Sequence, residues 1–162
     1  GAGSGCISIS ILKNLPQATA VALDISGKAI ETAKRNAEFH EVDDRLEFYL
    51  SDVFNELPAE QFDLIVSNPP YIPDADIAGL EPEVRDFEPI NALTDGGNGL
   101  SIIRRIVSNS PRFLRPGGSL LMEIGFGQSA EVESLFSPEI WKSVEVIRDL
   151  QSIPRTFNAK LH

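Results

Sequence analysis

Short apolar segments alternate with segments of helical periodicity along the whole chain, and no other feature of the sequence restricts its fold as strongly. Apolar runs such as residues 62–67 (FDLIVS) are typical of parallel strands that are covered on both faces. Parallel strands need a crossover connection, and the segments between these runs have the pattern of helices. The sequence therefore predicts an α/β protein with a doubly wound, Rossmann-like sheet that is mostly parallel.

The predicted elements can be assigned in chain order. We expect strands at residues 19–24, 45–50, 62–67 and 119–124, then two final strands at 144–149 and 155–160, the last of them antiparallel. We expect helices at residues 6–15, 28–39, 99–114 and 128–136, the second of them capped by Ser26. Residues 72–98 form a long, acidic, proline-bearing segment, which we interpret as a substrate-facing loop.

The beginning of the chain lacks one part of this pattern. Residues 1–5 (GAGSG) are typical of the turn that follows a first strand, but no strand precedes them in the sequence. The first strand of a doubly wound sheet lies in its middle, so its neighbours would have unpaired backbone without it. We therefore expect the full protein to carry at least one preceding strand.

Composition argues against several classes of partner and site. The chain has 14 Lys and Arg against 24 Asp and Glu, and the resulting net charge of −10 disfavours direct nucleic-acid binding. The single cysteine, Cys6, cannot form an internal disulfide, and we expect it to be a small buried apolar residue. His40 and His162 are far apart in the sequence, so we expect no metal site. Because no apolar run is long enough for a membrane, we expect no membrane contact and a cytoplasmic protein.

Glycines and acidic residues follow the first predicted strands, where nucleotide cofactors bind in such sheets. The glycines at positions 1, 3 and 5 permit a tight turn into a helix and a close approach of a ligand to the backbone. Asp24 ends the next strand, where its carboxylate can bind ribose hydroxyls or cap a turn. Asp52 and Val53 follow the strand after that, where they can bind an adenine ring or form a plain turn.

The most specific motif is Asn68-Pro69-Pro70-Tyr71, directly after the apolar strand 62–67. Two prolines remove two backbone N–H donors, stiffen the chain and leave outward-pointing carbonyl oxygens. The Asn68 side-chain oxygen and the Pro69 carbonyl can together accept both N–H groups of a planar amide or amine, while Tyr71 stacks on its plane. Such positioning aims the nitrogen lone pair at an electrophile and can supply up to roughly 7–11 kcal/mol. We therefore interpret the motif as an acceptor site rather than a rigid loop.

These motifs together resemble the class I methyltransferases, and more narrowly the HemK/PrmC family of release-factor glutamine methyltransferases. Residues 83–100 (EVRDFEPINALTDGGNGL) resemble that family's Val-x-x-(Phe/Tyr)-Glu-Pro-x-x-Ala-Leu segment and the Gly-rich turn after it. Residues 121–125 (LMEIG) with Gln128 resemble its fifth strand and next helix. The tetrapeptide 68–71 is also found in enzymes that methylate amino groups of nucleic acids, whereas its combination with Phe87-Glu88-Pro89 is more discriminating.

The resemblance implies that residues 1–162 are an S-adenosylmethionine-dependent catalytic domain. The family's substrate is the glutamine of a Gly-Gly-Gln motif in peptide chain release factors, and its product is N5-methylglutamine. Family members also carry a first strand and an N-terminal helical domain, which we expect to lie outside this sequence. The implied catalytic residues are Asn68, Pro69 and Tyr71. The implied substrate-binding residues are Asn68, Pro69, Pro70, Tyr71 and Glu88. The implied cofactor-binding residues are Gly1, Gly3, Gly5, Asp24, Ser26, Asp52, Val53 and Asn68.

Some alternatives stay open at this point. Glu88 and Pro89 either shape the loop around the active site or are a buried support that contacts no ligand. An enzyme that methylates adenine or cytosine amino groups of DNA or RNA would use the same tetrapeptide on a flipped base, although the acidic charge opposes this. A non-catalytic nucleotide-binding domain would share the fold without methyl transfer. A dehydrogenase fits poorly, because the Gly-x-Gly-x-x-Gly spacing is missing.

Overall fold

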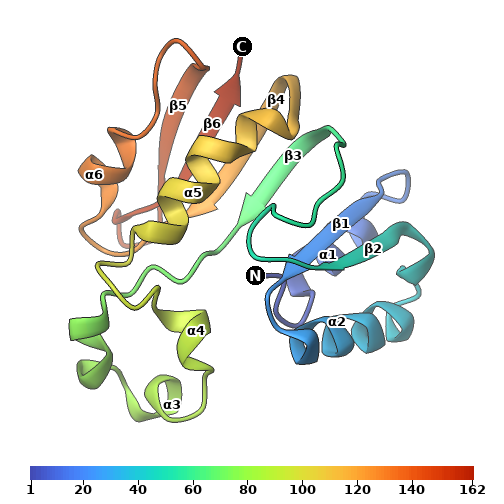
Figure 1. The fold of residues 1–162 in the computed structure, drawn as a ribbon, viewed down its shortest axis with the longest axis horizontal. Helices are drawn as coiled ribbons and strands as arrows, with labels where there is room; N and C mark the ends of the chain where they lie inside the picture. The colour runs from blue at the N-terminus through green and yellow to red at the C-terminus, as the bar shows by residue number, and fades with distance from the viewer. The chain divides into compact units, whose positions relative to one another are not determined.

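The computed structural model describes all residues from Gly1 to His162, which form two compact units. The first unit comprises Gly1–Pro58 and the second comprises Ala59–His162 (Figure 1). The strands belong to two separate hydrogen-bonded sheets, one with two strands and one with four. No helix of the structure combines the length and the apolar character that a membrane span requires.

The first unit packs two helices against a short parallel sheet. Its elements are α1 (Cys6–Asn14), β1 (Ala20–Asp24), α2 (Gly27–Phe39), the 3-10 turn η1 (Asp43–Arg45) and β2 (Leu46–Leu50). β1 and β2 are parallel, with Ala20 opposite Leu46 at one end and Asp24 opposite Leu50 at the other. One apolar face of each helix is buried with the strands in a core formed by Ile9, Leu12, Ala22, Ala37, Val42 and Leu46.

Side chains cap both helices of this unit. Ser26 is the N-cap of α2, as the sequence predicts, and its hydroxyl oxygen accepts a hydrogen bond from the Ala29 amide at 3.3 Å. At the other end of α1, the Arg45 guanidinium donates to the carbonyl oxygens of Leu12 and Leu15 at 3.1 and 3.3 Å. These bonds satisfy carbonyls that have no partner within the helix. The caps fix where each helix meets the sheet.

The second unit contains a four-stranded sheet with the order β3-β4-β6-β5. Its strands are β3 (Phe62–Ser67), β4 (Leu114–Glu123), β5 (Trp141–Arg148) and β6 (Pro154–Leu161). β3 pairs with β4 in parallel, whereas β6 is antiparallel to both β4 and β5. Only β6 therefore runs against the other strands of this sheet, which confirms the prediction of a mostly parallel sheet with an antiparallel C-terminal strand.

The helices of the second unit are short. They are α3 (Pro82–Arg85), α4 (Ile90–Leu93), α5 (Ser101–Asn109) and α6 (Ser129–Glu133), with the 3-10 turns η2 (Asp74–Gly79) and η3 (Ser110–Arg112). α5 lies in front of the strands in Figure 1 and buries Ile103, Ile106 and Val107. η2, α3 and α4 all fall within residues 72–98, so the predicted irregular loop contains short helical turns.

The predicted helix over residues 99–114 is too long at both ends. α5 begins at Ser101, after Gly99 with a left-handed φ of +77°. It ends at Asn109, because Pro111 has no N–H to continue the helical ladder and a 3-10 turn follows. Leu114 is already paired with Phe62 of β3, so the strand predicted from residue 119 begins earlier. The strand predicted from residue 144 likewise begins earlier, at Trp141.

Two predictions of burial are also wrong. Cys6 is exposed, because it is the first residue of α1 and the buried face of that helix carries Ile9 and Leu12 instead. β3 is not fully covered either, since Leu64 is 46% exposed and Asp63 is exposed beside it. The apolar run therefore predicts the strand correctly, but it does not predict how far other parts of the chain cover the faces of that strand.

Candidate functional site

The glycine loop of the first unit is held by a buried carboxylate. Gly3 donates its backbone N–H to Asp24 Oδ2 at 2.8 Å, and Ser26 donates its backbone N–H to Asp24 Oδ1 at 2.8 Å. The Ala2 amide also binds the Leu23 carbonyl at 2.8 Å, so the loop follows the end of β1 closely. The structure thus brings together three of the predicted cofactor-binding residues.

Gly5 and Gly3 need the freedom of glycine for different reasons. Gly5 has a φ of +80° and is the N-cap of α1, and a Cβ there would lie 3.1 Å from the Ala33 Cβ of α2. Gly3 has a φ of +57°, but no atom lies within 4 Å of where its Cβ would be. Gly5 therefore lets the two helices pack closely, while the backbone at Gly3 faces open space that a ligand can approach.

Asp24 fixes the turn and keeps room for a ligand. Its side chain is only 7% exposed, and each oxygen accepts one backbone N–H. A carboxylate has about four acceptor positions, so each oxygen retains one for another donor. The turn role that the sequence left open is therefore present in the structure, and the contact with ribose hydroxyls stays a prediction.

The turn after β2 has a strained backbone. Val53 has a φ of +56°, a left-handed conformation that a β-branched residue rarely adopts. Buried Ser51 holds it: its hydroxyl donates to the Val53 carbonyl at 3.0 Å and accepts from the Glu56 amide at 3.1 Å. Strain of this kind persists where surrounding bonds enforce it, and it is concentrated at functional sites. It favours a binding turn at Asp52 and Val53 over a plain turn.

The tetrapeptide Asn68–Tyr71 follows β3 directly, in the second unit. Asn68 is exposed and Pro69 is buried, so the amide side chain is accessible while the backbone beside it is enclosed. The two prolines donate no N–H. The next residue, Ile72, donates its amide to the Leu93 carbonyl at 2.9 Å and ties the exit of the motif to the end of α4.

Tyr71 is held through its hydroxyl and through its backbone. The hydroxyl donates to Glu123 Oε1 at 2.9 Å, at the end of β4. The Tyr71 carbonyl accepts a hydrogen bond from Gln128 Nε2 at 2.9 Å, and a Cβ at Gly99 would overlap that carbonyl. Glu123, Gln128 and Gly99 have no role that the sequence predicts, and their only signal there is that they stand in segments that resemble the family.

The electrostatics around Tyr71 keep it neutral. Burial, the hydrogen bond to Glu123 and the charge of Glu123 raise the pKa of the Tyr71 phenol to about 12, while Arg155 opposes the shift. At neutral pH the phenol therefore keeps its proton and donates a hydrogen bond to Glu123. The hydroxyl and the carbonyl of Tyr71 are thus each held by a separate hydrogen bond.

Asp95 organises the base of the loop that follows the motif. Its carboxylate accepts hydrogen bonds from the amides of Gly97, Gly99 and Ser101 at 2.9, 2.9 and 2.6 Å. Partial burial opposes ionisation, but these amides lower the pKa of Asp95 from its ordinary value. At the same base of the loop, the Asp74 amide donates a hydrogen bond to the Gly97 carbonyl at 2.9 Å. Both ends of residues 72–98 are thereby joined beside Tyr71.

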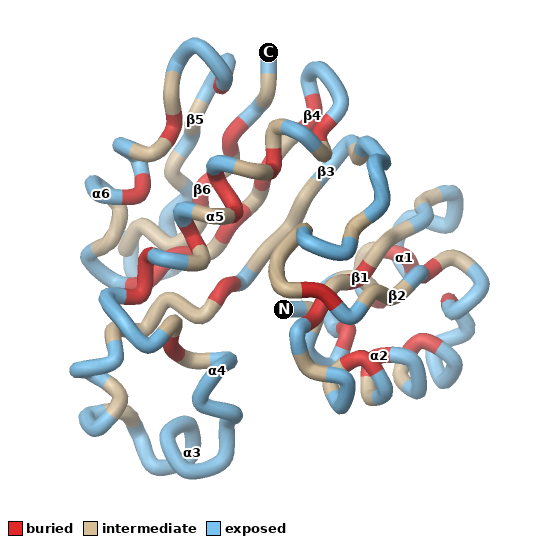
Figure 2. Tube along the Cα trace, viewed as in Figure 1, coloured by how far each residue is buried: buried red, intermediate tan, exposed pale blue.

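The tip of this loop is open to solvent. All residues from 81 to 90 are exposed, and the tip is pale blue in Figure 2. Phe87 is 84% exposed and Ile90 is 55% exposed. Glu88 and Pro89 are exposed too, so the alternative of a buried support is wrong. The helices on either side of Glu88 and Pro89, α3 and α4, are single turns, and neither buries a residue.

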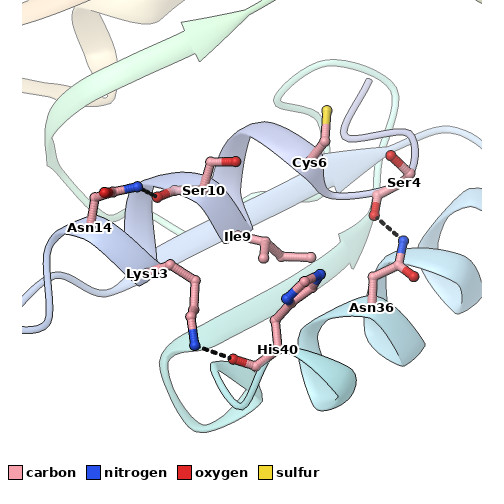
Figure 3. A pocket seen from close by; sticks show the side chains of 8 residues that line it. All are labelled: Ser4, Cys6, Ile9, Ser10, Lys13, Asn14, Asn36 and His40. Atoms are coloured by element: carbon pink, nitrogen blue, oxygen red, sulfur yellow. Dashed lines mark hydrogen bonds between the residues drawn. The ribbon is translucent and has the colours of Figure 1, made fainter.

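An open pocket of about 350 Å³ lies elsewhere in the first unit, between α1 and α2 (Figure 3). Its polar side chains already bind the chain itself: Lys13 Nζ donates to the His40 carbonyl at 3.2 Å, and Asn36 Nδ2 donates to the Ser4 carbonyl at 2.8 Å. Exposed Cys6 also lines it. None of the predicted cofactor residues does, so the pocket is separate from the glycine loop's Asp24 site.

The chain is similar to known methyltransferases in sequence and in fold. The family model described as "Methyltransferase small domain" matches residues 1–79. Release factor glutamine methyltransferases from Geobacter sulfurreducens and Nitratidesulfovibrio vulgaris are 42% and 44% identical over 99% of this chain. The aligned region covers 56% and 55% of those proteins, so the chain spans just over half of their length.

The fold comparison agrees with the sequence comparison. The crystal structure of TrmN from Thermus thermophilus matches 100% of this chain and 42% of that chain, with a TM-score of 0.70 and 18% identity. At that identity the match speaks for the α/β fold alone. The match confirms the predicted α/β fold class over the full length of the chain. Over nearly its whole length the chain is thus similar to proteins named release factor glutamine methyltransferases, and its residues 1–79 match the methyltransferase small-domain model.

Proposed function

We propose that residues 1–162 act as a catalytic domain that transfers a methyl group from S-adenosylmethionine to the side-chain amide nitrogen of glutamine in a peptide chain release factor. The identity of 42–44% with release factor glutamine methyltransferases over 99% of the chain carries this proposal. The geometry of Asn68–Tyr71 supports it, because the motif combines an exposed amide with a rigidly held aromatic ring. We further expect the protein to work in the cytoplasm, where translation termination takes place.

The cofactor side of the proposal rests on the first unit. S-adenosylmethionine supplies, when bound, a methyl group on a positively charged sulfur, together with ribose and adenine. Asp24 would accept the ribose hydroxyls, since its oxygens keep acceptor positions beyond the Gly3 and Ser26 amides. The open backbone around Gly1 and Gly3 leaves room for a ligand. Asp52 and Val53, on the strained turn, would contact the adenine. Gly5, Ser26 and Asn68 complete the proposed cofactor set.

The acceptor side rests on the second unit. A glutamine amide is a poor nucleophile because its lone pair is delocalised into the carbonyl group. The Asn68 side-chain oxygen and the Pro69 carbonyl would accept its two N–H groups and turn the lone pair toward the methyl group. The same two oxygens would stabilise the positive charge that develops on nitrogen before one proton leaves for water. Pro70 keeps this turn rigid, and neutral Tyr71 would stack on the amide plane.

The loop after the motif is proposed to contact the protein substrate. Its exposed tip combines Phe87 and Ile90 with the acidic Glu83, Asp86 and Glu88, and Arg85 is its basic residue. Its two ends meet beside Tyr71, so the loop extends from the motif that would receive the glutamine, and the flanks of that glutamine would meet the loop. We propose that Glu88 contacts those flanks, and we expect this surface to prefer a basic or apolar partner over a nucleic acid.

The proposal is tested by comparing initial rates of methyl transfer from labelled S-adenosylmethionine to a release factor, to DNA and to RNA. We expect transfer to the release factor alone. Asn68→Ala should lower the turnover by about a hundredfold or more, because it removes one of two orienting acceptors, while cofactor affinity changes by less than about threefold. Asn14→Ala, which alters an exposed amide of α1, is the matched control. Faster transfer to DNA or RNA would favour nucleobase amino methylation, and no transfer to any substrate would favour a non-catalytic domain.

A further inference from the structure

The Gln128 side chain forms a bridge between two backbone segments of the second unit. Its Nε2 donates to the Tyr71 carbonyl at 2.9 Å, and its Oε1 accepts from the Gly125 amide at 2.8 Å. Gln128 is the N-cap residue of α6, yet its side chain makes no hydrogen bond to that helix. A residue in a capping position thus uses its amide to join the Asn68–Tyr71 turn to the end of β4.

Two glycines leave room for this bridge. A Cβ at Gly125 would lie 2.8 Å from Gln128 Oε1 and 3.1 Å from Tyr71 Cδ2. A Cβ at Gly99 would overlap the Tyr71 carbonyl and lie 3.0 Å from Gln128 Nε2. Gly99 also has a left-handed φ of +77°. Three separate segments of the chain therefore close around one carbonyl and one amide side chain.

The prolines explain why the turn needs such a donor. Pro69 and Pro70 have no N–H, so neither can anchor the backbone of the turn by donating a hydrogen bond. The backbone can still be held through its carbonyl oxygens, and the Tyr71 carbonyl is the one that Gln128 binds. The two ends of the Gln128 amide divide these tasks, since its NH2 group donates to the Tyr71 carbonyl while its oxygen accepts from the Gly125 amide.

We propose that Gln128 is a positioning residue for amide methylation. By fixing the Tyr71 carbonyl, it sets the peptide planes of the prolines and hence the direction in which the Pro69 carbonyl meets the substrate amide. It acts through Tyr71 and touches no reacting atom. This role rests on the proposed function, since it concerns the orientation of the acceptor oxygens during methyl transfer.

Two variants test the role. Gln128→Glu keeps the acceptor for Gly125 but has no N–H for the Tyr71 carbonyl, and Gln128→Met removes both bonds at similar length. With release factor as substrate, we expect kcat per folded molecule to fall about ten- to a hundredfold in both variants, while KM changes by less than about threefold. Asn109→Ala is the matched control, because it also removes an amide-to-carbonyl bond of 2.8 Å in this unit. A kcat within about twofold of wild type in either variant overturns the proposal.

A backbone measurement separates this proposal from the proposed function. If the wild-type enzyme methylates no glutamine, the proposed function fails. Nuclear magnetic resonance then tests separately whether Gln128 holds the backbone of the turn. We expect the Tyr71 carbonyl carbon and the Asn68 side-chain amide to shift in both variants, and the Gly125 amide to exchange with solvent faster in Gln128→Met alone. Unchanged Tyr71 and Asn68 signals would show that Gln128 does not position the turn. Both readouts use samples that melt cooperatively, so loss of fold is detected separately.

Discussion

Single residues of the proposed site do more than their motif suggests. Asp24 holds the glycine loop through Gly3 and Ser26, and on our proposal it also binds ribose. Tyr71 is fixed at its hydroxyl by Glu123 and at its carbonyl by Gln128. In both cases the residue that would meet the ligand is first positioned by the chain itself. Removing such a residue should therefore change binding and local stability together.

Asp24→Ala should weaken S-adenosylmethionine binding by at least about tenfold, or about 1.4 kcal/mol. The variant loses the proposed ribose acceptor and leaves the Gly3 and Ser26 amides without their partner, which also costs roughly 1–3 kcal/mol of stability. Isothermal titration calorimetry measures the affinity, with thermal unfolding measured in parallel. Asp43→Ala, at an exposed position of η1, is the control and should change neither quantity. Unchanged affinity in a folded Asp24→Ala protein would contradict the assignment.

The Tyr71 phenol should make the protein less stable at high pH. Its folded pKa of about 12 lies above the ordinary value of 10.0, so its contribution is complete below pH 10 and is lost as the pH rises toward 12. Because the side chain is partly exposed, we expect a loss of roughly 1 kcal/mol rather than the full linkage value. Urea unfolding between pH 9 and about 12 should show a steeper decline for wild type than for Tyr71→Phe. Parallel curves for the two proteins would refute this prediction.

Sequence reasoning found the residues whose role depends on near neighbours. The Ser26 cap is decided within a few residues and was predicted. Glu123 and Gln128 lie 52 and 57 positions from Tyr71, so no local pattern links them to it. Cys6 was mispredicted because an apolar stretch does not reveal which side of a helix end is covered. The proposed site was thus predictable as a set of motifs but not as a set of contacts.

At the scale of elements, strands were predicted better than helix ends. The apolar runs identify β1, β2 and β3 within one residue of their bounds. The bounds of α5 depend instead on caps, on Gly99 before it and on Pro111 after it. The cap comes from Asp95, which lies six residues before Ser101 and outside any standard capping box. An unusual cap of this kind is visible only in the folded loop.

Asp95→Ala should lower the stability of the second unit by roughly 1–2 kcal/mol, as the loss of a good N-cap does. The carboxylate binds three backbone amides at the base of the loop and the start of α5. Because these amides lower the pKa of Asp95, its contribution is present above about pH 4 and is lost as the pH falls through the folded pKa. Denaturant unfolding at pH 7 and pH 3 tests both statements, with exposed Asp76→Ala as the control. Equal stability of wild type and Asp95→Ala at pH 7 would exclude this role.

At the scale of the whole molecule, the order of elements and the direction of the last strand were predictable, whereas the pairing of strands was not. Apolar periodicity shows which face of a strand is buried, but it does not show which strands are hydrogen-bonded to each other. The division of the strands into two sheets was therefore not predictable. The net charge of −10 and the acidic loop after Tyr71 both oppose contact with a phosphate backbone, in agreement with the protein substrate that we propose.

The most direct test is tandem mass spectrometry of a release factor after incubation with the purified enzyme and S-adenosylmethionine. We predict the mass of one added methyl group, located on the side-chain amide of the glutamine in the Gly-Gly-Gln motif, and its absence when Asn68→Ala replaces the wild-type enzyme. An unmodified glutamine under conditions in which the wild-type enzyme consumes S-adenosylmethionine, or a methyl group located on another residue, would contradict the proposed reaction.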